Sequence, residues 1–350
     1  MPLYKNLNPK RRADKRTLER LLILREKLRN QIPARSQSKT LLLASWNIRD
    51  FDKPGFGARL DESLYYIAEI ISCFDIVAVQ EIYRDLAALN KLMEILGDNW
   101  KYVFSDAAEG RQGNQERIAF VYDSQKVRFG GLAGELVIPP LERKVKDEQG
   151  NTTTVLEHLG QIWRTPLICG FQAGWARFML CNVHIQWGDS SADAPGRIRE
   201  IEHIAKFLKK RSEDPTAWAR KLILLGDFNI FSRKDSTYQV LEKAGFRCPE
   251  EFKEVYTNVA RTKQYDQILL RERKDRFEVL SGGTFDFFET VFRDDDEETY
   301  KPYMVKKGDG SMYRSYSQWR TFQMSDHLPL WLELQIDYAD EYLKTKLADA

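Results

Sequence analysis

The chain has 350 residues, of which 43% are hydrophobic, and a chain of this size can bury one large core or two modest ones. A mainly disordered protein is therefore excluded. The 54 basic and 52 acidic residues leave a net charge of +2, which by itself indicates neither a nucleic-acid nor a membrane partner.

Membrane insertion and secretion are not indicated by the sequence. No segment approaches the roughly 20 uninterrupted apolar residues that cross a bilayer. The N-terminal stretch KRRADKRTLERLLILREKLRN carries charges within and on both sides of its short apolar run, which is not typical of a secretory signal. The four cysteines show no CxxC spacing, so we expect neither a zinc site nor a disulfide framework. These features predict a cytoplasmic protein.

Residues 1–38 form a basic arm with eleven Lys or Arg against three Asp or Glu. From Thr17 to Ile32 the apolar residues follow a helical period, which predicts an amphipathic basic helix followed by the linker PARSQSK. The helix could be a solvated cap packed on the body of the protein, or it could contact phosphates or a partner. We favour the packed cap.

The next elements alternate between strands and helices. In chain order we expect strands at 41–46, 75–80, 100–105, 117–123, 163–171, 176–185, 221–226, 265–270 and 328–334, with helices at 60–72, 85–96 and 195–210. About ten strands are too many for one ordinary open sheet with crossovers, so the pattern indicates an α/β fold with two packed sheets and helices outside. The segments 135–154, 232–262 and 285–319 receive no assignment and are interpreted as functional loops or disorder.

We expect three parts in the chain. Residues 1–38 are the partly helical arm and linker, residues 39–340 are one catalytic domain, and residues 341–350 are a C-terminal tail. No internal repeat or boundary to a second domain interrupts the middle part.

Polar side chains follow the predicted strands. The stretch LILLGDFNIF places Asp227 and Asn229 directly after a buried strand, and other strands run into Asn47, Glu81 and His184. The last strand is preceded by Ser325, Asp326 and His327. Any one of these residues would ordinarily be a turn residue or a helix cap. Ligands of α/β proteins gather at one edge of the sheet, so five such strand ends together predict one shared site.

The residue types at these ends suit a divalent cation and proton transfer. Carboxylate and amide oxygens are the ligands that Mg²⁺ prefers, with water completing the shell. The chain has four histidines, and two of them, His184 and His327, fall at strand ends, where they are candidates for an acid and base pair. Each ring needs a carboxylate to orient it, and Asp266 and Glu116 at strand starts are available.

These residues carry a resemblance to a known family. The motifs WNIRDF, DIVAVQE, NQERIAFVYD, WRTP, NVHI, LLGDFN, YDQI and SDHLPL occur in the order typical of the endonuclease/exonuclease/phosphatase superfamily. They span residues 41–335 and are most similar to its deoxyribonuclease I branch. The resemblance implies a four-layer α/β sandwich and divalent-cation-dependent cleavage of a phosphoester.

The resemblance also implies a role for each matched residue. The metal ligands would be Glu81, Asn47, Asp326 and Asp227, with Mg²⁺ as the cation and Mn²⁺ or Ca²⁺ as alternatives. Asn229 and Arg164 would hold the phosphate, His184 would be oriented by Asp266, and His327 would be oriented by Glu116. The histidines would flank the scissile phosphorus, one taking and one giving a proton during in-line attack by water. Which histidine does which stays open.

The substrate is less determined than the reaction, because loops around the common site select it. The motif match, the basic arm and the arginines Arg49, Arg111 and Arg164 favour DNA and an endonuclease. The alternative is a phosphatase or phospholipase-type enzyme acting on a phosphoinositide, sphingomyelin or a nucleotide. A non-catalytic interaction protein is disfavoured, because the set of site residues is complete.

Overall fold

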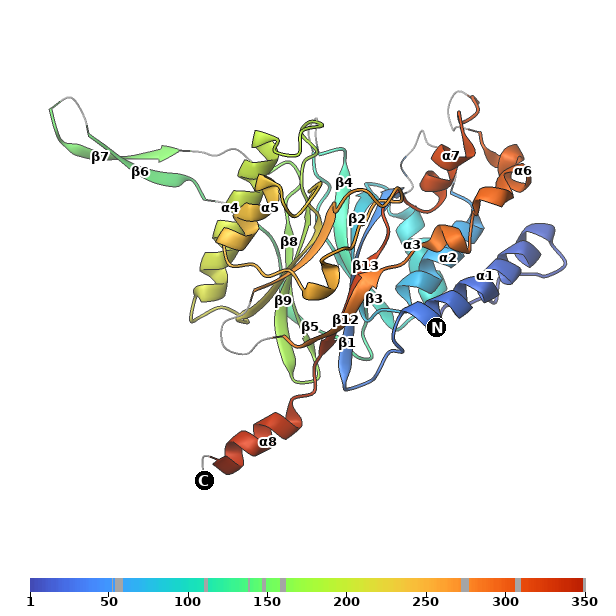
Figure 1. The fold of residues 1–350 in the computed structure, drawn as a ribbon, viewed down its shortest axis with the longest axis horizontal. Helices are drawn as coiled ribbons and strands as arrows, with labels where there is room; N and C mark the ends of the chain where they lie inside the picture. Colours follow the sequence, from blue (N-terminus) through green and yellow to red (C-terminus); the bar gives the residue numbers. More distant parts are fainter. Residues whose placement is uncertain are drawn as a thin grey trace.

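The protein is a four-layer α/β sandwich in the computed structural model, which describes residues 1–51, 53, 59–109, 113–137, 139–146, 149–157, 162–271, 277–305 and 310–348. Two sheets pack face to face, and helices cover both outer faces (Figure 1). The expected α/β architecture of two packed sheets is thus confirmed. None of the helices in these ranges is long and apolar enough to cross a membrane.

The first sheet has six strands in the order β12-β13-β1-β2-β4-β3. Their bounds are β12 Val279–Thr284, β13 Leu330–Gln335, β1 Thr40–Phe51, β2 Ile76–Tyr83, β4 Glu116–Asp123 and β3 Trp100–Phe104. Only β1 and β2 run parallel, and every other neighbouring pair in this sheet is antiparallel.

The second sheet has five strands in the order β11-β10-β9-β8-β5. Their bounds are β11 Asp266–Arg271, β10 Lys221–Asp227, β9 Ala176–His184, β8 Leu167–Ala173 and β5 Arg128–Glu135. Again one central pair is parallel, β9 with β10, and the other pairs are antiparallel. The carboxyl ends of the two parallel pairs carry Asn47, Glu81, His184 and Asp227, so both sheets deliver polar side chains to the same edge of the sandwich.

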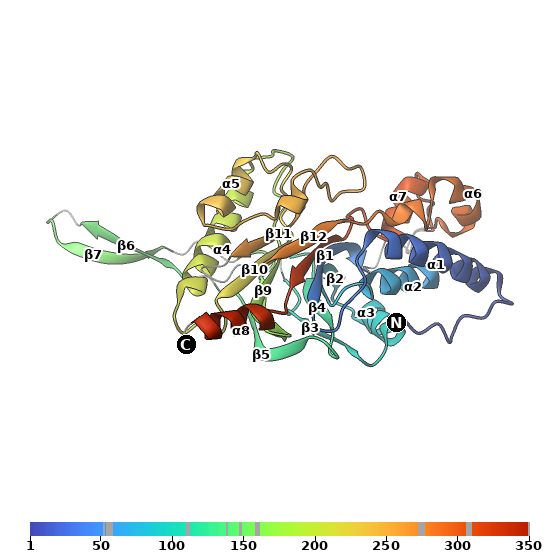
Figure 2. The same ribbon diagram turned by 60° about the horizontal axis from the view of Figure 1, so that its bottom comes forward.

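Three hydrophobic cores separate the four layers. The helices α1 Arg12–Gln31, α2 Asp61–Ile71 and α3 Ala87–Leu96 lie outside the six-stranded sheet, and α4 Pro195–Glu213 and α5 Ser236–Lys243 lie outside the five-stranded sheet (Figure 2). The middle core fills the space between the sheets. A strand covered on both faces has no solvated side, which is why Leu222 to Leu225 are continuously apolar and fully buried.

The arm packs on the body through α1. Leu21, Leu24 and Leu28 are buried in the outer core with α2. Basic side chains of the arm pair with acidic side chains of the body: Arg16 with Glu62, Arg20 with Asp296, Arg25 with Glu69, Lys27 with Glu289 and Arg35 with Asp75. This arrangement agrees with the packed cap, and it engages many of the charges that a phosphate contact would need.

The described residues form thirteen strands rather than about ten, and several elements lie where the sequence analysis predicted no helix or strand. They include β5, β12, the hairpin β6 Leu141–Lys146 with β7 Thr152–Glu157, and the helices α5, α6 Glu297–Tyr300, α7 Tyr316–Gln323 and α8 Ala339–Ala348. The hairpin projects from the body in both views (Figures 1 and 2), and its Val145, Val155 and Leu156 are exposed, so it lacks the buried face whose alternation predicts a strand. The strand expected from 163 begins at Leu167, which leaves Arg164 in the preceding loop.

Gly226 in β10 is required by a close backbone contact. Its φ is 136°, and a Cβ at this position would lie 2.0 Å from the carbonyl oxygen of Val183 on the neighbouring strand. A glycine in a strand commonly marks such an approach. Because the next residue is Asp227, the contact also fixes where that carboxylate emerges.

We predict that Gly226→Ala lowers the free energy of unfolding by roughly 3 kcal/mol or more, since the methyl group must displace a buried strand in an already unfavourable conformation. Urea unfolding followed by circular dichroism measures the change. The matched control is Gly134→Ala in β5, where no described atom lies within 4 Å of the added Cβ. Equal stability of the two variants would contradict the role of Gly226.

Candidate active site

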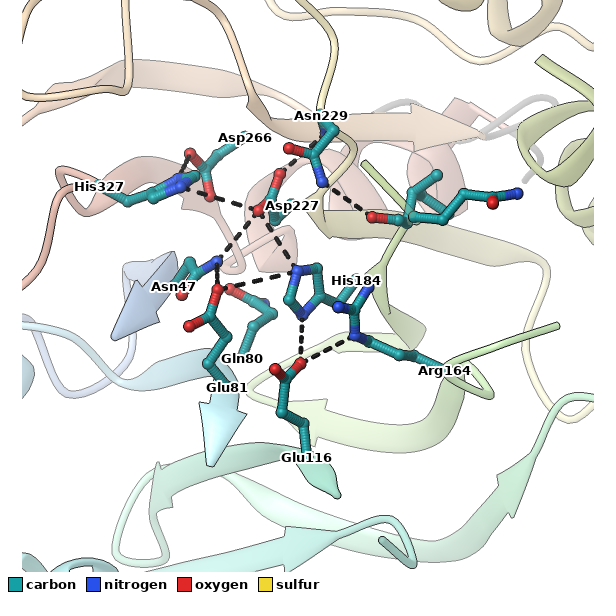
Figure 3. A network of polar contacts seen from close by, with 12 residues as sticks. Asn47, Gln80, Glu81, Glu116, Arg164, His184, Asp227, Asn229, Asp266 and His327 are labelled. Carbon is teal, nitrogen blue, oxygen red and sulfur yellow. Dashed lines mark hydrogen bonds and ion pairs between the residues drawn. The ribbon is translucent and has the colours of Figure 1, made fainter. Parts of the chain in front are cut away.

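Eight polar residues meet at one edge of the sandwich, and each is placed by the end of a strand (Figure 3). Asn47 and Glu81 come from the parallel pair of the six-stranded sheet, and His184 and Asp227 from that of the five-stranded sheet. Asn229 follows β10 and His327 precedes β13, while Glu116 and Asp266 begin β4 and β11. The side chains that were expected to lie together at one edge of the sheets are close to one another in the structure.

Asp227 lies at the centre of this group. Its Oδ2 accepts a hydrogen bond of 3.0 Å from Asn47 Nδ2 and lies 3.7 Å from His184 Nε2 and 3.8 Å from His327 Nε2. Its Oδ1 accepts a hydrogen bond of 2.8 Å from the backbone N–H of Asn229. Asp227 is only 2% exposed, so these neighbours take the place of water around the carboxylate.

Each histidine has a carboxylate behind it, but the partners are the reverse of those the resemblance led us to expect. His184 Nδ1 lies 3.2 Å from Glu116 Oε2, and His327 Nδ1 lies 2.8 Å from Asp266 Oδ2. The expectation that Asp266 orients His184 and Glu116 orients His327 is therefore wrong. The reason is the facing of the two sheets: β4 contacts β9 across the middle core, and β11 contacts β13. Each pair thus joins one sheet to the other.

Arg164 belongs to the Glu116 pair. Its Nε lies 2.8 Å from Glu116 Oε2, the oxygen that faces His184. Burial raises the pKa of Glu116, but His184 and Arg164 outweigh it and lower that pKa to about 2. Glu116 is therefore ionised at neutral pH. Arg164 was expected to contact a phosphate, and here its Nε supports the carboxylate that orients His184.

In the second pair the surroundings of His327 favour its protonated form. Burial lowers the pKa of His327, but the carboxylates of Asp266 and Asp227 outweigh it and raise that pKa well above its ordinary value. The ring of His327 also packs 5.6 Å from the ring of Tyr265. Its backbone N–H donates to Ser325 Oγ, which in turn donates to the carbonyl oxygen of Asn47.

Glu81 and Asn47 form the part of the site that fits a divalent cation. Asn47 Nδ2 donates to Glu81 Oε1 over 2.8 Å, while within the described ranges no donor reaches the buried Asn47 Oδ1. Burial, and after it the nearby carboxylate of Glu116, raise the pKa of Glu81. An orphaned amide oxygen beside such a carboxylate is the donor set of a hard cation.

The other predicted ligand, Asp326, lies at the rim. Its side chain is 44% exposed, and its Oδ2 lies 3.5 Å from Arg49 Nη1. Arg49 is held by the ring of Phe322, 3.9 Å from its guanidinium carbon, and by Thr321. A second acidic group consists of Asp227, Asp266 and His327, whose donor atoms lie within 4.8 Å of one another. Asp227 therefore belongs both to this group and to the metal ligands predicted together with Glu81 and Asn47.

Asn229, expected to hold a phosphate oxygen, is engaged with the protein in this structure. Its Nδ2 donates to the carbonyl oxygen of Ile185 over 2.8 Å, which ties the end of β10 to the end of β9. Its φ of 53° lies in the left-handed region, as do those of Glu81 at 61° and Asp50 at 41°. Such backbone strain gathers at functional sites, where surrounding contacts maintain it.

Two buried amides below the site were missed by the sequence analysis. Gln80 Nε2 donates to Asn182 Oδ1 over 2.6 Å, and Asn182 Nδ2 donates to the backbone carbonyls of Val79 and Ala119 on the opposite sheet. They hold the two sheets in register directly beneath the site. The available signal was a polar residue within each apolar strand, at DIVAVQ and LCNVH.

Glu200 on α4 is a further buried carboxylate next to the site. It accepts a hydrogen bond of 3.3 Å from the backbone N–H of Gln186, two residues after His184. Burial raises its pKa to about 7, against the opposing effects of the Gln186 N–H and of Arg164.

Comparison with known proteins identifies the fold. No family model matches the chain, and no curated protein matches it in sequence. An endonuclease/exonuclease/phosphatase family protein from Bacteroides thetaiotaomicron has a similar structure, with a TM-score of 0.53 at 18% identity over 86% of this chain and 97% of that one. A mannosyl-6-phosphatase from the same organism gives 0.52 at 18% identity over 84% and 99%. The D. rerio protein TDP2, complexed with a single-strand DNA product, gives 0.51 at 15% identity over 84% and 98%.

At these identities the likeness shows the fold. The four-layer sandwich that the motifs led us to expect is confirmed, and the chain resembles a solved endonuclease/exonuclease/phosphatase family protein over 86% of its length.

Glu200 generates a prediction about stability and pH. Between pH 4.5 and 7 the unfolded chain has released the Glu200 proton while the folded chain still holds it, so stability falls as pH rises through this range. Glu200→Gln should remove this fall. Relative to wild type, the variant should gain up to roughly 3 kcal/mol between pH 4 and pH 8 in urea unfolding. Glu202→Gln, on the same helix where Glu202 pairs with Lys206, is the control. An unchanged pH slope in Glu200→Gln would contradict the raised pKa.

Proposed function

We propose that this chain is a divalent-metal-dependent phosphodiesterase that cleaves DNA as an endonuclease. The observation that carries the proposal is the arrangement around Asp227. Two histidines, each with a carboxylate at Nδ1, direct both Nε2 atoms to one oxygen, beside an acidic amide-lined position suited to a cation.

The chain's own residues account for proton transfer. Glu116 and Asp266 hold the Nδ1 protons, so Nε2 of each ring can exchange a proton with the substrate side. In-line attack needs one group to take a proton from water and another to serve the leaving oxygen. The two rings supply these two groups on either side of Asp227.

Glu81, Asn47 and Asp227, with Asp326 at the rim, would hold the cation, Mg²⁺ being the best match for oxygen ligands. A bound cation supplies Lewis-acid stabilisation of the charge that develops on the phosphoryl oxygens. Arg49, beside Asp326, and the second amide N–H of Asn229 are the remaining groups available to a phosphate.

DNA as substrate is supported by the motif match to the deoxyribonuclease I branch and by TDP2, a structural neighbour that holds a DNA product. The arm gives less support for DNA, because many of its basic residues pair with acidic residues of the body. Arg111, which the sequence analysis also cited in favour of DNA, lies outside the described residues. The second candidate is a phosphatase or phospholipase-type activity. A mannosyl-6-phosphatase with a comparable TM-score favours it.

The proposal predicts that the purified protein nicks supercoiled plasmid in Mg²⁺ and stops when the metal is chelated. Glu81→Gln and His184→Ala should each lower the nicking rate by roughly 100-fold or more while remaining folded, since each removes a group that acts in the transition state. His203→Ala is the matched control, because the charged groups that act on this α4 histidine are Glu202, Lys206 and Arg199 rather than candidate site residues. Intact DNA in Mg²⁺, Mn²⁺ and Ca²⁺, with release of phosphate from a sugar or lipid instead, would favour the second candidate.

The observed histidine partners predict the outcome of a double-mutant cycle on kcat/KM. His184→Ala and Glu116→Gln should be strongly non-additive, because Glu116 acts only through the ring it orients. His184→Ala and Asp266→Asn should be closer to additive. The reverse result would restore the pairing expected from the sequence.

A further inference from the structure

Three aromatic side chains form a cluster beside the catalytic histidines, which we call the aromatic shelf: Trp187, Phe231 and Tyr265. The ring of Trp187 lies 5.2 Å from that of Phe231 and 5.6 Å from that of Tyr265, and Phe231 lies 5.7 Å from Tyr265. Tyr265 packs in turn against the ring of His327. Through Tyr265, the aromatic shelf lies directly next to the candidate catalytic residue His327.

Each ring of the shelf comes from a segment that also carries a site residue. Trp187 is three residues after His184, Phe231 is two residues after Asn229, and Tyr265 directly precedes Asp266. Trp187 is 43% exposed, whereas Phe231 and Tyr265 are partly buried. A large ring kept at the surface beside a reaction centre is costly in water and is typical of a binding surface.

Arg197 holds Trp187 in place. This arginine on α4 is fully buried, and its guanidinium donates to the backbone carbonyls of Trp187, Asp189, Ser191 and Ala192. Its guanidinium carbon also lies 5.5 Å from the ring centre of Trp187 and 5.0 Å from that of Phe231. Arg197 is thus a positioning residue for the loop that carries the exposed ring.

A second positively charged side chain lies next to the aromatic shelf. Lys263 Nζ lies 4.2 Å from the ring centre of Phe231. Two positive groups against the same rings make this region unfavourable for a quaternary ammonium such as the choline of sphingomyelin, which aromatic cages otherwise bind. The same charges favour a planar ring that is attached to phosphate.

We propose that the aromatic shelf binds an unpaired nucleobase next to the scissile phosphate, and that the enzyme therefore prefers single-stranded DNA to duplex. The inference rests on the nuclease function proposed above. Bases in a duplex are already stacked and paired, and presenting one to a protein ring costs unstacking energy. In a single strand each base offers a free face, and stacking on an aromatic side chain tolerates any sequence.

The test compares single-stranded oligonucleotides with intact bases and the same oligonucleotides with tetrahydrofuran in place of the bases. Trp187→Ala should lower kcat/KM on the intact strand by roughly 10- to 100-fold, mainly through KM, because one stacked base is lost. Trp187→Phe should recover most of the loss. On the strand without bases, wild type and Trp187→Ala should be equal.

The matched control is Trp175→Ala. Trp175 is 57% exposed and packs on Tyr342, and it precedes the first residue of β9, whereas His184 is the last. A nine-residue strand separates the two ends by roughly 25 to 30 Å. Loss of the indole here should leave both substrates unaffected.

Binding can also be measured without cleavage, in a protein that carries the Glu81→Gln substitution. Binding of the intact oligonucleotide should quench tryptophan fluorescence, and the added Trp187→Ala change, unlike Trp175→Ala, should abolish most of that quenching. If wild type cleaves strands with and without bases equally, and Trp187→Ala has the same kcat/KM as Trp175→Ala, the shelf proposal is overturned. The proposed nuclease function is then unaffected. If wild type cleaves no DNA but releases phosphocholine or sugar phosphate, the proposed function fails and the shelf proposal fails with it.

Discussion

The carboxylate of Asp227 is the point on which the site depends. It is buried at the junction of the two sheets, and three different segments direct an N–H or a ring nitrogen towards its Oδ2. A buried carboxylate keeps its charge only when such neighbours compensate the lost water. The packing of one sheet on the other therefore determines the geometry of the candidate catalytic groups, because neither sheet alone contains a complete histidine–carboxylate pair.

The fold supports this junction in two ways. The amides of Gln80 and Asn182 bond across the middle core and fix how the sheets face each other. Gly226 lets β10 approach β9 so closely that no side chain fits. The left-handed backbones at Asp50, Glu81 and Asn229 each cost roughly 1 to 3 kcal/mol, and three hydrophobic cores on either side of the sheets make that cost tolerable.

Electrostatics divides the molecule into two kinds of region. The arm is strongly basic in sequence, yet α1 directs much of that charge into ion pairs with the acidic face of α2 and with residues 289 and 296. At the candidate active site, by contrast, the buried Asn47 Oδ1 has no donor among the described residues, and Arg197 and Lys263 lie against aromatic rings. Acidic and basic side chains are thus both concentrated where a cation and a phosphate-bearing ligand would meet.

The sequence alone predicted two packed sheets with helices outside, and it predicted most of the side chains that gather at the candidate active site. Apolar periods located most strands and four of the helices, and polar residues at successive strand ends predicted the shared edge, since ligands of α/β proteins gather where strands end. Only the tertiary structure decided which side chains contact one another: Glu116 contacts His184, Asp266 contacts His327, and Arg164 contacts Glu116. It also formed the shelf from Trp187, Phe231 and Tyr265, which lie apart in the chain. Such contacts depend on how two sheets face each other, and no local period encodes that arrangement.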